Sequence, residues 1–228
     1  MSRAETQPSQ ASLIEALVAD LKSVRPVRLA GAYALALAMQ FGFVAIAALL
    51  MGIDPVALIP MFSGPMGALL VVLVAGAVSC GLVAVRMSVP GRYVSPYVTG
   101  GLALLPIVLS VLVFAVSSSM PDWDHYVAHF VGGLGCLGAT LKMALPAWVL
   151  SILLLRRLAP IGPTAVGLFA GLTALLQGAL LVQLTCPITE PFHLALTHYA
   201  PLIFIAAVAS AASGWLLRIV GRTPTSAA

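Results

Sequence analysis

Six long apolar stretches alternate with short polar connections along the chain. They cover residues 29–52, 65–87, 96–117, 129–155, 163–185 and 192–217. Each has about the 20 residues that a helix needs to cross a hydrocarbon core of about 30 Å. The pattern therefore predicts an all-α, polytopic membrane protein with six transmembrane helices. The short connections favour antiparallel neighbours in one bundle.

A shorter periodic segment precedes the first apolar stretch. Ser12 and Glu15 have the spacing of a capping box, which predicts that a helix starts at Ser12. Apolar residues then recur on one face of this helix, namely Leu13, Ile14, Leu17, Val18 and Leu21. A helix of about three turns is too short to be stable alone in water. Its apolar face therefore needs a covering surface, which is either the bilayer or a protein partner.

Charge is scarce and unevenly placed. The chain is 61% hydrophobic and only 8% charged, whereas soluble domains carry about 25% charged residues. All the Lys and Arg residues except Lys142 lie at alternate connections, and they are Arg3, Lys22, Arg25, Arg28, Arg86, Arg92, Arg156, Arg157, Arg218 and Arg222. Because cytoplasmic loops carry the excess of Lys and Arg, both termini are predicted to be cytoplasmic.

This topology divides the chain into three parts. Residues 1–28 form a cytoplasmic segment with the amphipathic helix, residues 29–218 form the transmembrane bundle, and residues 219–228 form a cytoplasmic tail. The net charge of +4 comes from the ends of the apolar stretches. It therefore indicates a lipid bilayer as surroundings, and we expect no direct contact with nucleic acid.

Reactive side chains gather on the predicted outer side. The stretch CPITEPFHLALTH holds Cys186, Glu190, His193 and His198, and Cys136 lies about two turns into the fourth apolar stretch from its outer end. Thiols on that side can form a disulfide or bind a soft metal ion, and both alternatives stay open. The two histidines are five residues apart, about 140° on an α-helix. This spacing differs from the i, i+4 spacing of a zinc-binding helix.

Lys142 is the only charged residue deep inside a predicted span. A charge within a membrane is a functional hypothesis by default. Its side chain should lean toward the outer end of its helix, where Glu190, Asp122 and Asp124 are candidate partners. Snorkelling to lipid headgroups is the alternative.

Prolines and glycines predict where the spans bend and touch. Kinks are expected at Pro106, Pro146 and Pro201. Close helix contacts are expected at Gly167 and Gly171, and along the side of the fourth span that carries Gly132, Gly135 and Gly138.

Sequence signatures of common enzymes are absent. The chain contains no G-x-S-x-G, H-E-x-x-H, P-loop or C-x-x-C motif. We therefore expect a protein without catalytic activity and without a permanently bound cofactor. A membrane thiol oxidoreductase and a small permease remain the competing hypotheses.

Two blocks of sequence carry a family resemblance. They are GGLGCLGATLKMALPAWVLSILLLRRLAP at 132–160 and GLFAGLTALLQGALLVQLTCPITEPFHLALTHYAP at 167–201, followed by GWLLR at 214–218 and preceded by LIEALVADLKSVRPVR at the N-terminus. Together they resemble the NrsF family, bacterial six-helix membrane proteins that negatively regulate extracytoplasmic-function (ECF) sigma factors.

The resemblance implies an anti-sigma factor in the bacterial inner membrane. The family's cysteine pair matches Cys136 and Cys186, and the resemblance implies that these thiols sense heavy metals or oxidants. A soft metal ion bound transiently by the two thiols is one form that this sensing could take. The resemblance also implies that the N-terminal segment binds the sigma factor. The residues expected to make that contact are Leu13, Ile14, Leu17, Val18, Leu21 and Arg25.

Overall fold

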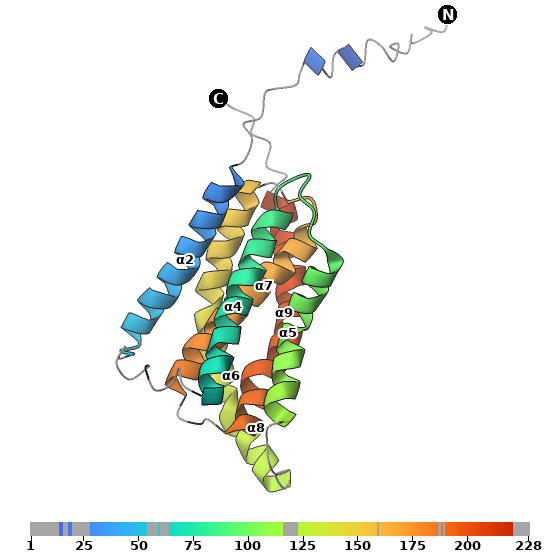
Figure 1. Cartoon of the computed structure of the whole chain (residues 1–228). Helices are drawn as coiled ribbons and strands as arrows, with labels where there is room; N and C mark the ends of the chain where they lie inside the picture. Colours follow the sequence, from blue (N-terminus) through green and yellow to red (C-terminus); the bar gives the residue numbers. More distant parts are fainter. Residues whose placement is uncertain are drawn as a thin grey trace, which may run out of the picture.

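The protein is a bundle of long helices. The computed structural model describes residues 14–15, 18–19, 28–53, 59, 64–115, 123–158, 160–186, 188 and 190–220. Within these ranges six helices are long and apolar enough to cross a membrane, and no strand is found. Figure 1 shows the helices side by side in one bundle. The predicted all-α fold with six spans is therefore confirmed.

The helices begin and end close to the predicted boundaries. The long ones are α2 (Leu29–Leu50), α4 (Gly64–Met87), α5 (Pro96–Ala115), α6 (Trp123–Leu155), α7 (Pro163–Thr185) and α9 (Ala200–Val220). Three short elements complete the order, namely the 3-10 turn η2 (Arg156–Leu158), the single turn α8 (Pro191–His193) and the π-helix η3 (Leu194–Tyr199). The sixth span is therefore composite, because α8, η3 and α9 follow one another without a break.

Helix α7 forms the centre of the bundle. Its side chains are buried almost without interruption from Val166 to Gln183, and it packs against α4, α6 and α9. A helix that is apolar on all sides is expected where neighbours enclose it. The surrounding helices instead expose large apolar side chains such as Leu50 and Phe204, as the lipid-facing side of a membrane protein does.

Two glycines let α9 approach α7 closely. A Cβ atom added at Gly171 would lie 2.9 Å from the Cβ of Ala209, and one added at Gly167 would lie 3.1 Å from the carbonyl oxygen of Ser210. Real Cβ atoms essentially never have a contact as short as the one at Gly171, and they rarely have one as short as the one at Gly167. The predicted contact through these two glycines is therefore confirmed.

The glycine prediction for the fourth span is wrong. A Cβ atom at Gly132, Gly135 or Gly138 would meet nothing within 4 Å. The close-packed glycine of α6 is instead Gly133, where an added Cβ would collide with the side chain of Thr197 in η3. The run of glycines does contain a contact position, but it lies on the opposite side of the helix from the three predicted glycines.

The three prolines fall into two groups. Pro106 and Pro146 lie inside α5 and α6, which continue through them. Pro201 follows η3 after a single residue. Proline has no amide hydrogen to donate, so a helix next to it must rearrange its hydrogen bonds, and π-helical turns are one such rearrangement. The kinks themselves remain predictions.

The described arginines of the connections gather at one end of the bundle. In Figure 1, α2 begins and α9 ends at the end where α4 also finishes and α7 starts. The neighbouring arginines are Arg28, Arg86, Arg92, Arg156, Arg157 and Arg218. Two of them tie chain segments together, since Arg86 Nε donates to the carbonyl of Tyr93 at 3.0 Å and Arg218 Nη2 donates to Thr164 Oγ1 at 3.3 Å. Assigning this end to the cytoplasm remains a prediction from charge.

Candidate functional site

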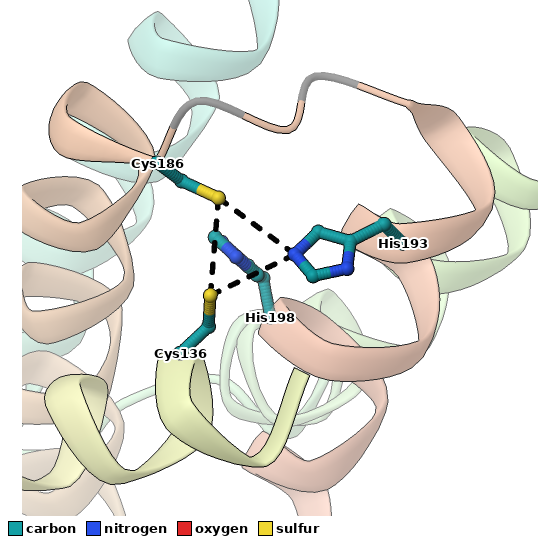
Figure 2. Close-up of side chains that lie close together, drawn as sticks. All are labelled: Cys136, Cys186, His193 and His198. Carbon is teal, nitrogen blue, oxygen red and sulfur yellow. Dashed lines mark hydrogen bonds between the residues drawn. The ribbon is translucent and has the colours of Figure 1, made fainter. Parts of the chain in front are cut away.

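Four side chains with metal-binding atoms meet at the other end of the bundle. They are Cys136, Cys186, His193 and His198, and one ligand atom from each lies within 4.8 Å of all the others. Figure 2 shows the four side chains pointing toward a common centre. We call these four residues the Cys–His cluster. They come from α6, from the end of α7 and from the α8–η3 segment.

Three of the contacts in the cluster are short and nearly equal. The sulfurs of Cys136 and Cys186 are 3.8 Å apart. Each sulfur lies 3.7 Å from Nε2 of His193. All three cysteines of the chain are thiols rather than disulfides, and the Cys186 thiol also donates to the carbonyl oxygen of Ile188 at 3.5 Å. The predicted sensor pair is therefore brought into contact in its reduced form.

The last turn of α7 positions Cys186. This residue is the C-cap of α7, has an extended backbone, and its amide donates to the carbonyl of Val182 at 2.7 Å. Because α7 is enclosed by its neighbours, its end is fixed relative to α6, which carries Cys136 on a partly buried side. The two thiols, fifty residues apart in the chain, thus meet through the packing of two long helices.

The π-helix η3 explains why His193 and His198 share one site. An α-helix would place these residues about 140° apart, and the structure corrects that expectation. In a π-helix the hydrogen bonds join residues five apart, so residues at this spacing lie on about the same face. The two ring centroids are accordingly 5.4 Å apart. Pro201, which cannot donate an amide hydrogen bond to Thr197, is the sequence signal for an irregular turn here.

Thr197 connects the cluster to its support. Its hydroxyl donates to the carbonyl oxygen of His193 at 2.8 Å and lies 3.4 Å from Nε2 of the same residue. The side chain of Thr197 also rests against Gly133 of α6, one helical turn before Cys136. Sequence reasoning missed both Thr197 and Gly133, because their role depends on how α6 and η3 face each other.

The two histidines are completely buried, each with 0% of its surface exposed. Within the described part of the chain, neither ring nitrogen of His198 has a hydrogen-bond partner. Buried polar atoms are nearly always paired, so this side chain calls for an explanation. The cluster as a whole offers two sulfur and two nitrogen ligands and could hold a metal ion.

A buried polar chain lies beside the cluster. The hydroxyl of Tyr199 donates to Oε1 of Gln183 at 3.1 Å, and Nε2 of Gln183 donates to the sulfur of Met66 at 3.2 Å. Tyr199 also packs edge-on against His198, with ring centroids 6.2 Å apart. These contacts link η3 to α7 and α4, so the position of His198 is tied to the bundle core.

The other predicted site residues are not members of the four-residue cluster. Lys142 is exposed and lines an apolar groove between α6, α7 and α9. Its expected pairing with Glu190, Asp122 or Asp124 stays a prediction, as does the alternative of snorkelling to lipid headgroups. Glu190 caps α8, and its carbonyl accepts the amide of Leu194 at 3.1 Å. The side chains of Asp122 and Asp124 lie outside the described residues.

The N-terminal segment is described only in part. Ile14 and Val18 are helical, and each is 59% exposed. Leu13, Leu17, Leu21 and Arg25 lie outside the described residues. The predicted sigma-binding face is therefore represented by two exposed apolar side chains one turn apart.

Comparisons with known proteins give one family. Neither the curated proteins nor the solved structures contain a match to this chain. A family model described as NrsF, negative regulator of sigma F, matches residues 17–219. The match runs from the N-terminal helix to the end of α9 and includes the whole Cys–His cluster. The chain therefore belongs to the NrsF family of negative regulators of a sigma factor.

Proposed function

We propose that this protein is an anti-sigma factor of the bacterial inner membrane that responds to its outer thiols. In this proposal the cytoplasmic N-terminal segment holds an ECF sigma factor. Binding of a heavy metal ion at Cys136 and Cys186, or their oxidation, then releases it. The protein acts as a regulator and not as an enzyme.

One observation carries the proposal. Two thiols from separate long helices lie 3.8 Å apart, at the end of the bundle away from the described arginines. A change that draws these sulfurs together, or fixes them around an ion, must act on α6 and α7 at once. Both helices run to the arginine-rich end, so they connect the thiols to that end of the bundle.

The energy available is sufficient for a switch. Shifting a two-state equilibrium from 1:99 to 99:1 needs about 5.5 kcal/mol of differential binding. Structural thiolate metal sites supply roughly 10 kcal/mol or more, whereas a disulfide typically contributes about 2–4 kcal/mol. Metal capture alone can therefore drive the full transition, and oxidation needs a more evenly balanced starting state.

The N-terminal helix supplies a surface for the partner. Ile14 and Val18 are exposed and one turn apart, which is the arrangement that amphipathic helices use to enter an apolar groove. The family assignment favours a sigma factor, rather than the bilayer, as the surface that covers this apolar face. It also favours regulation over the two competing hypotheses. A single thiol pair supports an oxidoreductase only weakly, and one exposed lysine, Lys142, supports a permease only weakly.

The thiol mechanism is tested in cells with a reporter for the sigma factor's target promoter. Cys136→Ala and Cys186→Ala are compared with Cys80→Ala, which changes a buried thiol of α4 outside the cluster. The two cluster variants should lose induction by Cd²⁺ or oxidant, and the Cys80 variant should keep it. Normal induction in both cluster variants would remove the thiols from the mechanism.

Sigma binding is tested separately in the full-length chain. Ile14→Asp and Val18→Asp place charge on the exposed face, so the double variant should no longer retain an ECF sigma factor at the membrane in unstressed cells. The reporter should then be active without any inducer. A double variant that still represses the promoter would move the sigma contact elsewhere on the protein.

A further inference from the structure

The two histidines of the cluster complete a set of four metal-binding side chains around the two thiols. We propose that Cys136, Cys186, His193 and His198 form one tetrahedral site for a borderline or soft divalent cation, of which Zn²⁺ and Cd²⁺ are the ions that fit. This inference rests on the proposed function and deepens it, because it names all four ligands and the coordination geometry.

The spacing of the ligand atoms matches a tetrahedral metal site. With metal–sulfur bonds of about 2.3 Å and metal–nitrogen bonds of about 2.0–2.1 Å, tetrahedral coordination separates two sulfurs by about 3.8 Å and a sulfur from a nitrogen by about 3.5–3.6 Å. The structure has 3.8 Å between the sulfurs of Cys136 and Cys186. It has 3.7 Å from each sulfur to Nε2 of His193. Three edges of the tetrahedron are thus already in place.

His198 supplies the fourth corner. Its ring lies 5.4 Å from that of His193, centroid to centroid, and a ring nitrogen falls within 4.8 Å of each of the other ligand atoms. The side chain is fully buried, and neither nitrogen is hydrogen-bonded within the described part of the chain. A bond to a metal ion would satisfy one of these buried nitrogens. This observation is independent of the sulfur geometry.

The donor set selects the class of ion. Thiolate and imidazole ligands suit Zn²⁺ and softer ions, whereas Mg²⁺ and Ca²⁺ need oxygen ligands. Binding converts two thiols to thiolates and releases two protons to solvent, while the imidazoles bind in their neutral form. Two thiolate charges then balance one divalent cation. The bound site is neutral overall, which suits a buried position where an unpaired charge would be costly.

The support around the cluster holds the ligands before an ion arrives. Gly133 lets η3 lie directly against α6, and Thr197 binds the carbonyl of His193. The C-cap geometry of α7 fixes Cys186. Ligands arranged in advance lose less freedom on binding, so affinity increases. An ion held here would join α6, α7 and the α8–η3 segment at one point.

The site is tested on the purified full-length protein in detergent, kept reduced and stripped with a chelator. Zn²⁺ and Co²⁺ are used as probes. We expect one ion per chain, a Co²⁺ visible spectrum typical of tetrahedral coordination, and X-ray absorption of the Zn²⁺ form showing two sulfurs and two nitrogens. Because this absorption measurement uses the unmodified chain, it does not depend on whether variants fold. A shell of sulfur alone, a shell without sulfur, or no stoichiometric binding would overturn the site.

Variants assign the ligands individually. His193→Gln and His198→Gln should each weaken Zn²⁺ affinity by more than about 100-fold, since loss of an outer-shell partner alone costs about 10–100-fold. Cys136→Ala should do the same. Cys80→Ala should bind as tightly as the unmodified chain. Unchanged affinity in both histidine variants would reduce the site to the two thiols and refute the four-ligand geometry.

Comparing metal binding with reporter induction tests the four-ligand site separately from the proposed function. Metal binding by the purified chain involves no sigma factor. If the four-ligand site is found but Cys136→Ala and Cys186→Ala leave reporter induction intact, the sensor function fails and the site stands. If those variants abolish induction but no ion is bound by sulfur and nitrogen together, the site fails and the thiol sensor stands.

Discussion

Replacing Gly133 by alanine should force α6 away from η3. An added Cβ would collide with the side chain of Thr197 and would lie only 2.7 Å from its Cβ atom. Ordinary van der Waals contact begins at 3.4 Å, so that pair of atoms alone requires a separation of about 0.7 Å. Overpacking of this kind typically costs about 1–3 kcal/mol.

Gly132→Ala provides a matched control on the same helix. An added Cβ at Gly132 meets nothing within 4 Å. Both substitutions gain about 0.8–1.0 kcal/mol of helix propensity, and this gain cancels when the two variants are compared. The Gly133 variant should therefore be less stable than the Gly132 variant by the overpacking cost, about 1–3 kcal/mol. Thr197→Ser removes the methyl group nearest to the new Cβ, so it should restore part of the loss in the double variant.

Reversible unfolding in mixed detergent micelles measures these differences, and Zn²⁺ titration measures the effect on the Cys–His cluster. Moving α6 outward also moves Cys136, so the Gly133 variant should bind Zn²⁺ more weakly than the Gly132 variant. Equal stability of the two variants within about 0.5 kcal/mol would refute the close contact between α6 and η3, since this is the scatter of neutral surface substitutions.

Three further variants each change a single side chain. His198→Leu removes two unpartnered buried nitrogens, so thermal melts with chelator should show a metal-free chain more stable by about 1–3 kcal/mol; a lower melting temperature would contradict the assignment. The same variant should lose the stabilisation of about 2.7 kcal/mol that Zn²⁺ gives at 100 times its Kd. Tyr199→Phe deprives Oε1 of Gln183 of its buried donor and should cost about 1–3 kcal/mol in the same melts. Lys142→Leu should change stability by less than about 0.5 kcal/mol and leave Zn²⁺ affinity unaltered, because Lys142 is exposed and away from the cluster.

The spans could be predicted because their signal is local. A helix in lipid must be apolar for about 20 residues, and no distant residue is needed to recognise it. The same reasoning identified the contact glycines Gly167 and Gly171, whose spacing is itself a local pattern. The central position of α7 is harder to predict from the sequence. The one indication is that α7 is hydrophobic on all sides, which is typical of a buried helix.

The Cys–His cluster was only half predictable for the opposite reason. Cys136 and Cys186 could be assigned to one depth from topology, but the distance between them depends on how α6 and α7 pack. The histidines were judged on α-helical geometry, and η3 has another geometry. The sequence does not distinguish Gly133 from Gly132, Gly135 and Gly138, because a glycine run does not reveal which side of its helix meets a neighbour. That side is set by the rotation of α6, which the whole bundle determines.

The position of the cluster bears on how a signal could travel. Cys136 and Leu155 are nineteen residues apart on α6, a rise of about 29 Å, and Leu155 adjoins the arginines of η2. Stiff packed helices pass on small displacements because packed interfaces have discrete arrangements rather than continuous ones. Under the proposed function, an ion that drew Cys136, Cys186 and His193 together would therefore act at the far ends of α6 and α7. Pro146 lies between the cluster and that end, where a missing hydrogen bond makes α6 easiest to bend, so it is the place where a shift of Cys136 would be converted into a change at the arginine-rich end.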